Sequence, residues 1–398
     1  MSALVRFVTR PLRRRARTVY RWFDERLGLS ELVHKGLYEA VPEKGAWAYS
    51  LGSATLILIL LQIITGIFLM FTFVPSVEES WDSLRYLQTT DHFGNWVRGL
   101  HEFGAYVLII VIGAHMLRTF ISASYKRPRE LNWVTGALLF LLVLGLAITG
   151  AMLPWDQAGY WTTVVVTNIP HYIPFLGDAI RAIWRGGDLV GPLTLTRTFA
   201  IHVWALPALL IGLIVLHLYL LRRHGEFGSW VNYETTTDHP DREIAERIVQ
   251  AEPPYPTQRI DRKYAAPRRT VDFFPDQLAK DTVVSAVLVT VVFVMGLISG
   301  PFLDERANPA TLTYVPTPEW FYLPLDQILV LNPQTWLIFF GVFILVMAAL
   351  LAFILLPFID RSPERAPLRR PEVLVPGAFF VITVVYLCLI GANRLFNL

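Results

Sequence analysis

Two long apolar segments, residues 98–118 and 196–223, constrain this chain more than any other feature. Each carries two histidines: His101 and His115 in the first, His202 and His217 in the second. The intervals, 101 to 115 and 202 to 217, are 14 and 15 residues long. At about 100° per helical residue, intervals of 14 and 15 residues both come close to four whole turns, so each helix presents its two imidazoles on one face. The two imidazoles of a helix are then about 21–22 Å apart along its axis. Parallel helices would therefore bring the four histidines together at two levels.

A single histidine in an apolar helix is usually a hydrogen-bonded residue of the bundle. Four histidines at nearly equal spacing favour two bis-imidazole sites, because ionisable residues within a membrane are costly and commonly serve a function. The chemistry that best fits such sites is bis-histidine ligation of two non-covalently bound b-type haems. The single cysteine, Cys388, excludes an intrachain disulfide, a cysteine-ligated iron–sulfur cluster and a Cys-x-x-Cys-His haem attachment.

The apolar segments predict an all-α polytopic membrane protein. Hydrophobic residues make up 54% of the 398 residues, and the mean hydropathy is +0.45, too apolar for an ordinary soluble protein. Seven transmembrane helices are predicted, of which the first four form a di-haem four-helix bundle. They cover about 47–73, 99–121, 133–153, 199–221, 281–300, 335–358 and 374–393.

A hydrophilic stretch divides these spans into two groups. The predicted organisation is a cytoplasmic N-terminal segment at 1–46, a di-haem module at 47–223, a hydrophilic cytoplasmic linker at 224–280, and a three-helix module at 281–398. The arginine-rich start lacks the short apolar region and cleavage site of a signal peptide. No motif supports nucleic-acid binding.

Lysine and arginine near the ends of the spans predict the orientation. By alternation, the basic residues of the N-terminus and of 126–129, 222–223 and 361–370 all fall on one side, while the opposite loops are acidic. We therefore expect a multi-pass protein of the bacterial cytoplasmic (inner) membrane with a cytoplasmic N-terminus. His101 and His202 then lie near the outer face, and His115 and His217 near the inner face.

Two pairs of glycines repeat the histidine interval. Gly52 and Gly66 in the first span, and Gly136 and Gly150 in the third, are each 14 residues apart. Glycine facing a flat macrocycle lets the backbone approach where a Cβ would collide. The alternative is ordinary packing of small residues between membrane helices, which is common.

Arginines flank the histidines and are expected to contact haem propionates. Arg98 precedes His101 by three residues, and Arg118 follows His115 by three. Each lies within one helical turn of its histidine, and anionic propionates need such partners. Arg197, five residues before His202, is a weaker candidate. Snorkelling at the interface is the alternative; it explains Arg118 but not Arg98 on the outer side.

The outer loops predict a binding pocket. Residues 153–161 and 317–324 are dense in Trp, Tyr and Pro, which suits a rigid aromatic pocket at the interface. Glu319 is the carboxylate expected in it, as the proton acceptor for an amphipathic ring-shaped substrate that loses protons on oxidation. An aromatic belt with a helix-capping glutamate is an equally good interpretation of composition alone.

At these motifs the sequence resembles the cytochrome b family, the quinol-oxidising core of cytochrome bc and b6f complexes. The resemblance rests on RxxH…HxxR around the first histidine pair, the second pair, LPWDQAGYW, TLTR and PEW. The layout looks like cytochrome b6 fused to its subunit IV. The 15-residue interval also matches the b6 side of the family, since mitochondrial-type members usually have 14 and an eighth span.

The resemblance implies roles for named residues. His101 with His202 would ligate the outer haem iron, and His115 with His217 the inner one. Glu319 would line the outer quinol site together with Pro318, Trp320 and Tyr322. At the inner quinone site, Asp281 and Arg222 are the implied contacts.

The implied activity is that of the di-haem cytochrome b subunit of a quinol:cytochrome c (or similar carrier) oxidoreductase. Quinol oxidation would be bifurcated: one electron passes to a Rieske iron–sulfur protein docked on residues 154–170, and the other crosses the membrane to reduce quinone, which contributes to the proton motive force. A cytochrome c-type subunit and a second copy of the chain are the other implied partners. Two alternatives stay open: a di-haem anchor of a dehydrogenase or hydrogenase, and a transporter with bundle histidines.

The sequence departs from the family at two positions. Ser50 stands where b6-type proteins have a cysteine that tethers an extra c-type haem, so no covalent haem is expected there. The outer motif reads PEWF rather than PEWY, with Phe321 at the tyrosine position and Tyr322 next.

Overall fold

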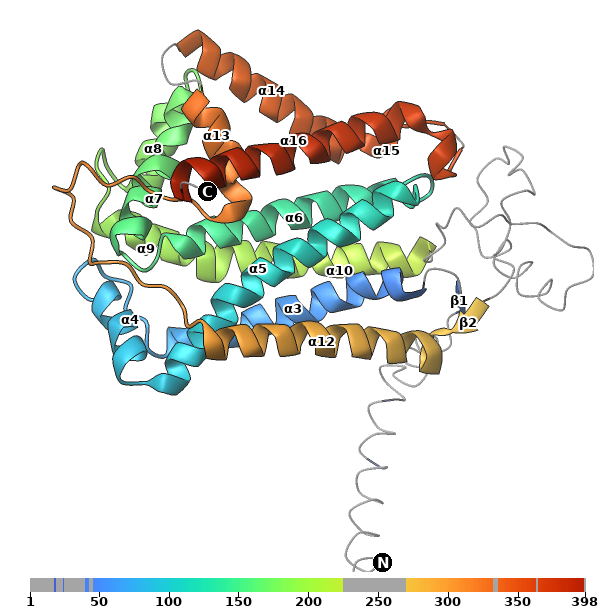
Figure 1. Ribbon diagram of the computed structural model, residues 1–398, viewed down its shortest axis with the longest axis horizontal. Coiled ribbons are helices and arrows are strands. Elements are labelled where there is room, and N and C mark those ends of the chain that lie inside the picture. The colour runs from blue at the N-terminus through green and yellow to red at the C-terminus, as the bar shows by residue number, and fades with distance from the viewer. Residues whose placement is uncertain are drawn as a thin grey trace, which may run out of the picture. The chain divides into compact units, whose positions relative to one another are not determined.

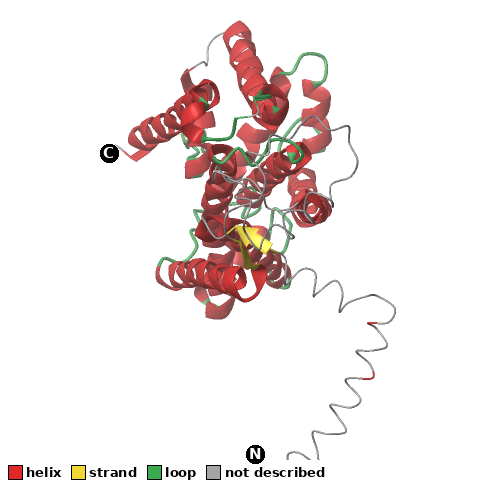
Figure 2. Ribbon diagram, turned by 90° about the vertical axis from the view of Figure 1, so that its right-hand side faces the viewer, coloured by secondary structure: helices red, strands yellow, loops and turns green. Residues whose placement is uncertain are grey.

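The structure, a computed structural model, describes residues 18, 24, 40–42, 46–224, 270–331, 336–362 and 364–396. Most of the predicted N-terminal segment and most of the predicted linker therefore lie outside the described residues. The described chain is almost entirely helical (Figures 1 and 2), which confirms the predicted all-α class. Within it, the strands are β1 (Ala40–Pro42) and β2 (Thr270–Asp272), which pair antiparallel.

The long helices lie where the sequence predicts membrane spans. Six helices in the described residues are long and apolar enough to cross a membrane. They are built from α3 (Ala46–Met70), α5 (His92–Ile121), α6 (Glu130–Ala151), α9 (Pro192–Ala200) continuing into α10 (Leu206–His224), α12 (Leu278–Ile298) preceded by the turn η4 (Phe273–Gln277), and α16 (Pro371–Phe396). Helix α14 (Trp336–Ile354) covers the remaining predicted span, so the seven-helix expectation agrees with the structure.

Short helices occupy regions that the sequence analysis treats as connecting loops. They are α4 (Ser80–Thr89), α7 (Gln157–Asn168), η1 (Ile169–Tyr172), α8 (Gly177–Arg185), η5 (Trp320–Tyr322), α13 (Leu323–Leu331) and η6 (Pro367–Arg369). A further short helix, α15 (Leu356–Ile359), lies at the end of the predicted span 335–358. Side-chain caps explain two of the helix starts. Asp91 accepts a hydrogen bond from the Gly94 amide at 3.0 Å, so α5 begins well before the predicted residue 99. Asp156 caps α7 through the Gly159 amide at 2.7 Å.

The chain divides into two compact units. One comprises Met1–Ser50 and Val231–Val283, and the other Leu51–Trp230 and Val284–Leu398. The division falls within α3 and α12. All four histidine-pair residues and the four paired glycines belong to the second unit. The division of the chain into a di-haem module, a linker and a three-helix module, with boundaries after residues 223 and 280, stays a prediction.

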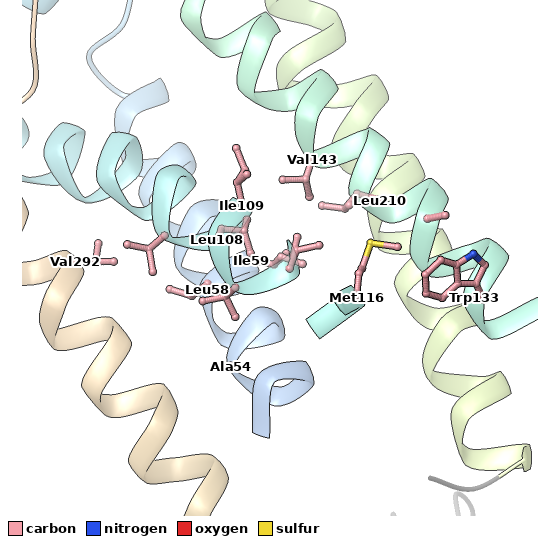
Figure 3. Close-up of a cluster of buried hydrophobic side chains, with 14 of the residues drawn as sticks. Ala54, Leu58, Ile59, Leu108, Ile109, Met116, Trp133, Val143, Leu210 and Val292 are labelled. Atoms are coloured by element: carbon pink, nitrogen blue, oxygen red, sulfur yellow. The ribbon is translucent and has the colours of Figure 1, made fainter. Parts of the chain in front are cut away.

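The core of the second unit lies among α3, α5, α6 and α10, which run alongside one another (Figure 1). Figure 3 shows the buried side chains that fill it, among them Leu58, Leu108, Val143 and Leu210, one from each of these helices. Without water, packing and close backbone approach hold membrane helices together. One such approach joins α5 to α12, where a Cβ on Gly99 would stand 3.1 Å from the Cα of Gly296.

A π-helical turn, η2 (Ile201–Ala205), joins α9 to α10 and contains His202. The Leu206 amide donates to the Ile201 carbonyl, five residues back, rather than to the carbonyl four residues back. Such a turn accommodates one extra residue within a helix. The 15-residue interval from His202 to His217 therefore spans nearly the same turns as the 14-residue interval in α5. The unequal spacing seen in the sequence thus has a local structural cause.

A buried polar cluster joins two loops at the end of the second unit that is predicted to face the cytoplasm. The Asp360 carboxylate accepts from Lys126 Nζ at 2.8 Å, from the Tyr125 hydroxyl at 2.5 Å and from Arg370 Nη1 at 3.3 Å. The charged side chains are at most 6% exposed. Arg370 also donates to the Ile121 carbonyl at 2.8 Å. This Asp360 cluster connects the segment after α5 with the segment between α15 and α16.

Candidate functional site

The four histidines gather in two pairs. The ring centroids of His101, on α5, and His202, on η2, lie 6.3 Å apart with their planes at 78°. Further along the same helices, His115 lies close enough to His217 for a charge on one imidazole to act on the other. Helix α5 and the α9–α10 segment therefore run in the same direction, as the two-level arrangement requires.

Each histidine faces one of the predicted glycines. A Cβ at Gly66, Gly52 or Gly136 would lie 3.3 Å from the Cε1 of its imidazole, and a Cβ at Gly150 only 2.9 Å from it. The partners are Gly66 with His101, Gly52 with His115, Gly136 with His217 and Gly150 with His202. The glycines were predicted to make room for a macrocycle. The contact that the structure shows is with the imidazole edge, which sets the depth of each ring.

Threonine hydroxyls hold three of the four rings, and the sequence analysis missed them. The Nδ1 atom of His101 lies 2.9 Å from the Thr65 hydroxyl, and that of His217 lies 2.9 Å from the Thr135 hydroxyl. The Nδ1 atom of His202 lies 3.1 Å from the Thr149 hydroxyl. The available signal was the Thr-Gly dipeptide that recurs at 65–66, 135–136 and 149–150.

The direction of these hydrogen bonds follows from the threonine's second contact. Thr65 also donates to the Leu61 carbonyl at 2.7 Å, and Thr135 and Thr149 donate to the carbonyls four residues before them at 2.9 and 2.7 Å. Since each hydroxyl proton is engaged there, the hydroxyl oxygen accepts from the ring Nδ1–H. The proton is thereby fixed on Nδ1, and Nε2 carries the lone pair that a metal needs.

The pair geometry fits a metal held between two imidazoles. Two imidazole–metal bonds of about 2 Å, as in zinc sites, plus the radii of two rings add up to the 6.3 Å between the centroids of His101 and His202. In the described part of the chain, the His, Cys, Asp and Glu side chains form no group of three or more able to hold a bare metal ion. Two imidazoles that face each other in this way fit the bis-histidine ligation of a haem iron.

The predicted arginines lie in different surroundings. Arg98 is 7% exposed; its Nη2 donates to the Phe302 carbonyl, while its buried Nη1 has no hydrogen-bond partner among the described residues. That leaves a buried cationic donor beside the outer pair, which fits a propionate. Arg118 is half-buried and acts electrostatically on His115. Arg197 is exposed and donates to the Ile183 carbonyl.

The outer carboxylate is paired with a tyrosine that was also missed. The Tyr106 hydroxyl, on α5, donates to Glu319 Oε2 at 2.7 Å. Burial raises the pKa of the Glu319 carboxyl above its ordinary range, and the hydrogen bond from Tyr106 opposes that rise. Of the other predicted pocket residues, Pro318 is half-buried and Trp320 is 42% exposed. Tyr322 donates its hydroxyl to the Leu144 carbonyl of α6.

Asp156 locks the 153–161 loop onto the segment that leads to Glu319. It is 4% exposed, and besides capping α7 it accepts from the Asp304 amide at 3.0 Å. The Gln157 amide donates to the Glu305 carbonyl at 2.8 Å. The Trp81 indole donates to the Asp304 carbonyl, also at 2.8 Å. The segments around residues 81, 156 and 304 are therefore fixed together.

The predicted inner-site residues fall in separate units. Asp281, in the first unit, is 5% exposed, and Gln277 Nε2 donates to it at 2.7 Å and to Ser50 Oγ at 3.2 Å. An open cavity of about 370 Å³ lies in this unit, lined by Trp47, Pro275, Asp276, Ala279, Lys280 and Val283. Arg222 is exposed and belongs to the second unit.

Comparison with known proteins matches both parts of the chain. Residues 38–225 match the family model described as cytochrome b/b6/petB, and residues 306–397 match the one described as cytochrome b (C-terminal)/b6/petD. The chain is 39% identical over 218 residues to the menaquinol:cytochrome c reductase cytochrome b subunit of Geobacillus thermodenitrificans, covering 53% of this chain and 97% of that one. The chain belongs to the cytochrome b family.

Two further comparisons agree with this assignment. Cytochrome b6 of Synechococcus sp. (strain JA-3-3Ab) is 37% identical over 210 residues, 53% of this chain and 98% of that protein. A solved structure titled "Hyperthermophilic respiratory Complex III" superposes with a TM-score of 0.75 at 28% identity and covers 93% of this chain and 90% of that one. Cytochrome b proteins are multi-pass membrane haem proteins of electron transport, which agrees with the long apolar helices and the imidazole pairs.

Proposed function

We propose that this cytochrome b is the di-haem subunit of a membrane quinol:cytochrome c (or similar carrier) oxidoreductase. Quinol would be oxidised at the outer end by bifurcation, and quinone reduced at the inner end, contributing to the proton motive force. The observation that carries the proposal is the pairing of imidazoles at two levels, together with the half-buried carboxylate of Glu319 that α5 holds through Tyr106. The printed names of relatives, a menaquinol:cytochrome c reductase subunit and a complex III, support the same activity.

The histidines would hold the two haem irons. His101 and His202 would hold the outer b-type haem, and His115 and His217 the inner one, each through Nε2. Bound haems would supply two one-electron carriers spaced across the membrane. The free Nη1 of Arg98 would receive a propionate of the outer group. Arg118 would do the same at the inner level, whereas the exposed position of Arg197 supports its role less well.

Glu319 would accept a proton from quinol. Its raised pKa brings the carboxyl nearer to neutral pH, where a general base works best. The hydrogen bond from Tyr106 fixes the carboxylate in place, and Pro318, Trp320 and Tyr322 would line the pocket. The locked loops around Asp156 keep this pocket rigid. Residues 154–170 would offer the docking surface for a Rieske iron–sulfur protein, and a cytochrome c-type subunit and a second copy of the chain would complete the complex.

At the inner end, Asp281 would contact quinone beside Gln277. The role predicted for Arg222, which belongs to the other unit, stays a prediction. The proposed orientation places the N-terminus in the cytoplasm of a bacterial cell, with the chain in the inner membrane. Ser50 keeps its hydroxyl in a hydrogen bond from Gln277, and no covalent haem is proposed at that residue.

Haem reduction by quinol tests the proposal. The purified complex, mixed with a menaquinol analogue, is expected to reduce two spectrally distinct b-type haems only when its Rieske partner is present and oxidised. Glu319→Gln is expected to slow this reduction at least tenfold while both haems stay bound. Glu305→Gln, a change at an exposed outer carboxylate, is the matched control. Reduction that needs no Rieske protein would favour the alternative, a di-haem anchor of another quinone-linked enzyme.

A further inference from the structure

The two imidazole pairs differ in the hydrogen bonds that their Nδ1 atoms make. At the outer level, both His101 and His202 donate from Nδ1 to a threonine. At the inner level, only His217 does so. The Nδ1 of His115 is buried and has no hydrogen-bond partner among the residues that the structure describes.

One side-chain difference accompanies the missing contact; the other three imidazoles also meet a backbone carbonyl of the helix that faces them, at Gln62, Asn132 and Leu146. In three cases the threonine immediately precedes the glycine that faces the imidazole, as Thr65 precedes Gly66. The residue before Gly52 is Leu51, which has no hydroxyl. The ring of His115 sits against Gly52 just as the others sit against their glycines, with Nδ1 at 3.7 Å from the Cβ position, compared with 3.9 Å at Gly66 and 3.8 Å at Gly136. A hydroxyl at residue 51 would therefore stand where the other three do.

The contact has an electronic consequence. An acceptor at Nδ1–H moves electron density onto the ring and makes Nε2 a stronger donor. A stronger donor stabilises the oxidised form of a bound iron and lowers its reduction potential. Two threonines thus act at the outer level and one at the inner level.

We propose that Leu51 is a positioning residue that keeps the inner haem the easier of the two to reduce, by withholding from His115 the hydrogen bond that the other three ligands make. The inference rests on the proposed ligation. Each threonine hydrogen bond lowers the reduction potential of the haem that its histidine holds. Thr65 and Thr149 both act on the outer haem, whereas at the inner haem only Thr135 acts, because Leu51 has no hydroxyl. The resulting difference favours electron transfer from the outer to the inner level.

Equilibrium redox measurements on the purified complex test the inference. Absorption spectra recorded over a range of potentials give one midpoint for each haem, and His115→Ala identifies the inner signal. Leu51→Thr is expected to lower the inner midpoint and leave the outer one unchanged. Thr135→Val, which removes the hydroxyl from the opposite ligand, is expected to raise the inner midpoint. Thr65→Val is expected to raise only the outer one.

Leu51→Val is the matched control, because it changes the size of the side chain without adding a hydroxyl. The inference is overturned if Leu51→Thr and Thr135→Val both bind two haems and both give the same inner midpoint as Leu51→Val. The proposed histidine ligation would stand in that case. If the native complex holds no pair of bis-histidine haems, the proposed function itself fails. The measured quantity is the inner midpoint potential, which Leu51→Thr should lower and Thr135→Val should raise. A purely structural role for these residues would not produce shifts of opposite sign.

Discussion

The backbone of Gly150 lies so close to the ring of His202 that a Cβ at residue 150 would stand 2.9 Å from Cε1. At that distance something must shift, whereas the 3.3 Å found at the other three glycines requires only a small adjustment. Gly150 therefore fixes the ring most tightly of the four. The helix that carries it also supplies Thr149, which bonds the same imidazole. One helical dipeptide thus sets both the depth and the rotation of a proposed ligand.

Gly150→Ala is expected to displace His202 and weaken retention of the outer haem. Overpacking of this kind costs about 1–3 kcal/mol, which corresponds to roughly 5- to 150-fold in affinity. Haem content and the reduced spectrum of the purified protein measure the loss. Gly113→Ala is the matched control, because a Cβ there would meet nothing within 4 Å. Equal loss in both variants would contradict the close-contact argument.

The pH dependence of quinol oxidation is expected to report Glu319. Because burial raises the pKa of this carboxyl, the proton-accepting carboxylate forms only as pH rises through a value above the ordinary glutamate pKa of about 4.3. The rate should therefore increase with pH through that value. Tyr106→Phe removes the hydrogen bond that opposes the rise, so the pKa goes up further and the profile moves to higher pH. A Tyr106→Phe profile that moves to lower pH would exclude this assignment.

Asp360→Asn is expected to destabilise the inner end of the second unit. The substitution leaves Lys126 and Arg370 buried without their counter-ion, and breaking a buried ion pair costs about 3–5 kcal/mol. Thermal unfolding in detergent, followed by circular dichroism, measures the change. Asp178→Asn, whose side chain is 69% exposed and also paired, is the control and should shift the midpoint little.

Acid should reproduce part of that loss in the native protein. Burial alone would raise the pKa of Asp360, but hydrogen bonds from Lys126 and Tyr125 outweigh it and hold the pKa below its ordinary range. A depressed pKa stabilises the folded state fully above the unfolded value of about 3.9, and this stabilisation is lost as pH falls through the folded value. The stability difference between native protein and Asp360→Asn should therefore shrink below about pH 4. A difference that stays constant would count against the cluster.

The π-helical turn at His202 predicts an unequal tolerance of deletions. Removing the exposed Trp204 would let the turn close into ordinary helix, so that the 14-residue interval left behind matches the one in α5. Removing the exposed Ile110 from α5 would instead rotate His115 by about 100° relative to His101. Haem content should be largely kept in the first variant and fall to one group or none in the second. Similar losses in both would contradict the role of the turn.

The sequence predicted the elements that depend on periodicity. The long helices, the pairing of the histidines and the matching of Gly52, Gly66, Gly136 and Gly150 to them follow from intervals along single helices. The threonine contacts depend on how one helix is rotated against another, and only the repeated Thr-Gly dipeptide pointed to them. Tyr106 and Glu319 are 213 residues apart, and no local pattern joins them. The short outer helices were missed because their caps lie in stretches with little apolar periodicity.

The Asp360 cluster bears on how a gene for such a protein can be organised. Its anion comes from the C-terminal part of the chain, and Tyr125 and Lys126 come from the N-terminal part. The Trp133 indole adds a further link by donating to the Phe353 carbonyl at 2.8 Å. These contacts do not depend on the peptide connection through residues 225–269. The relatives from Geobacillus and Synechococcus match 53% of this chain along nearly their whole length. The same side-chain and backbone contacts are open to two separately encoded chains as well as to a single fused one, because none of them is a covalent bond between the halves.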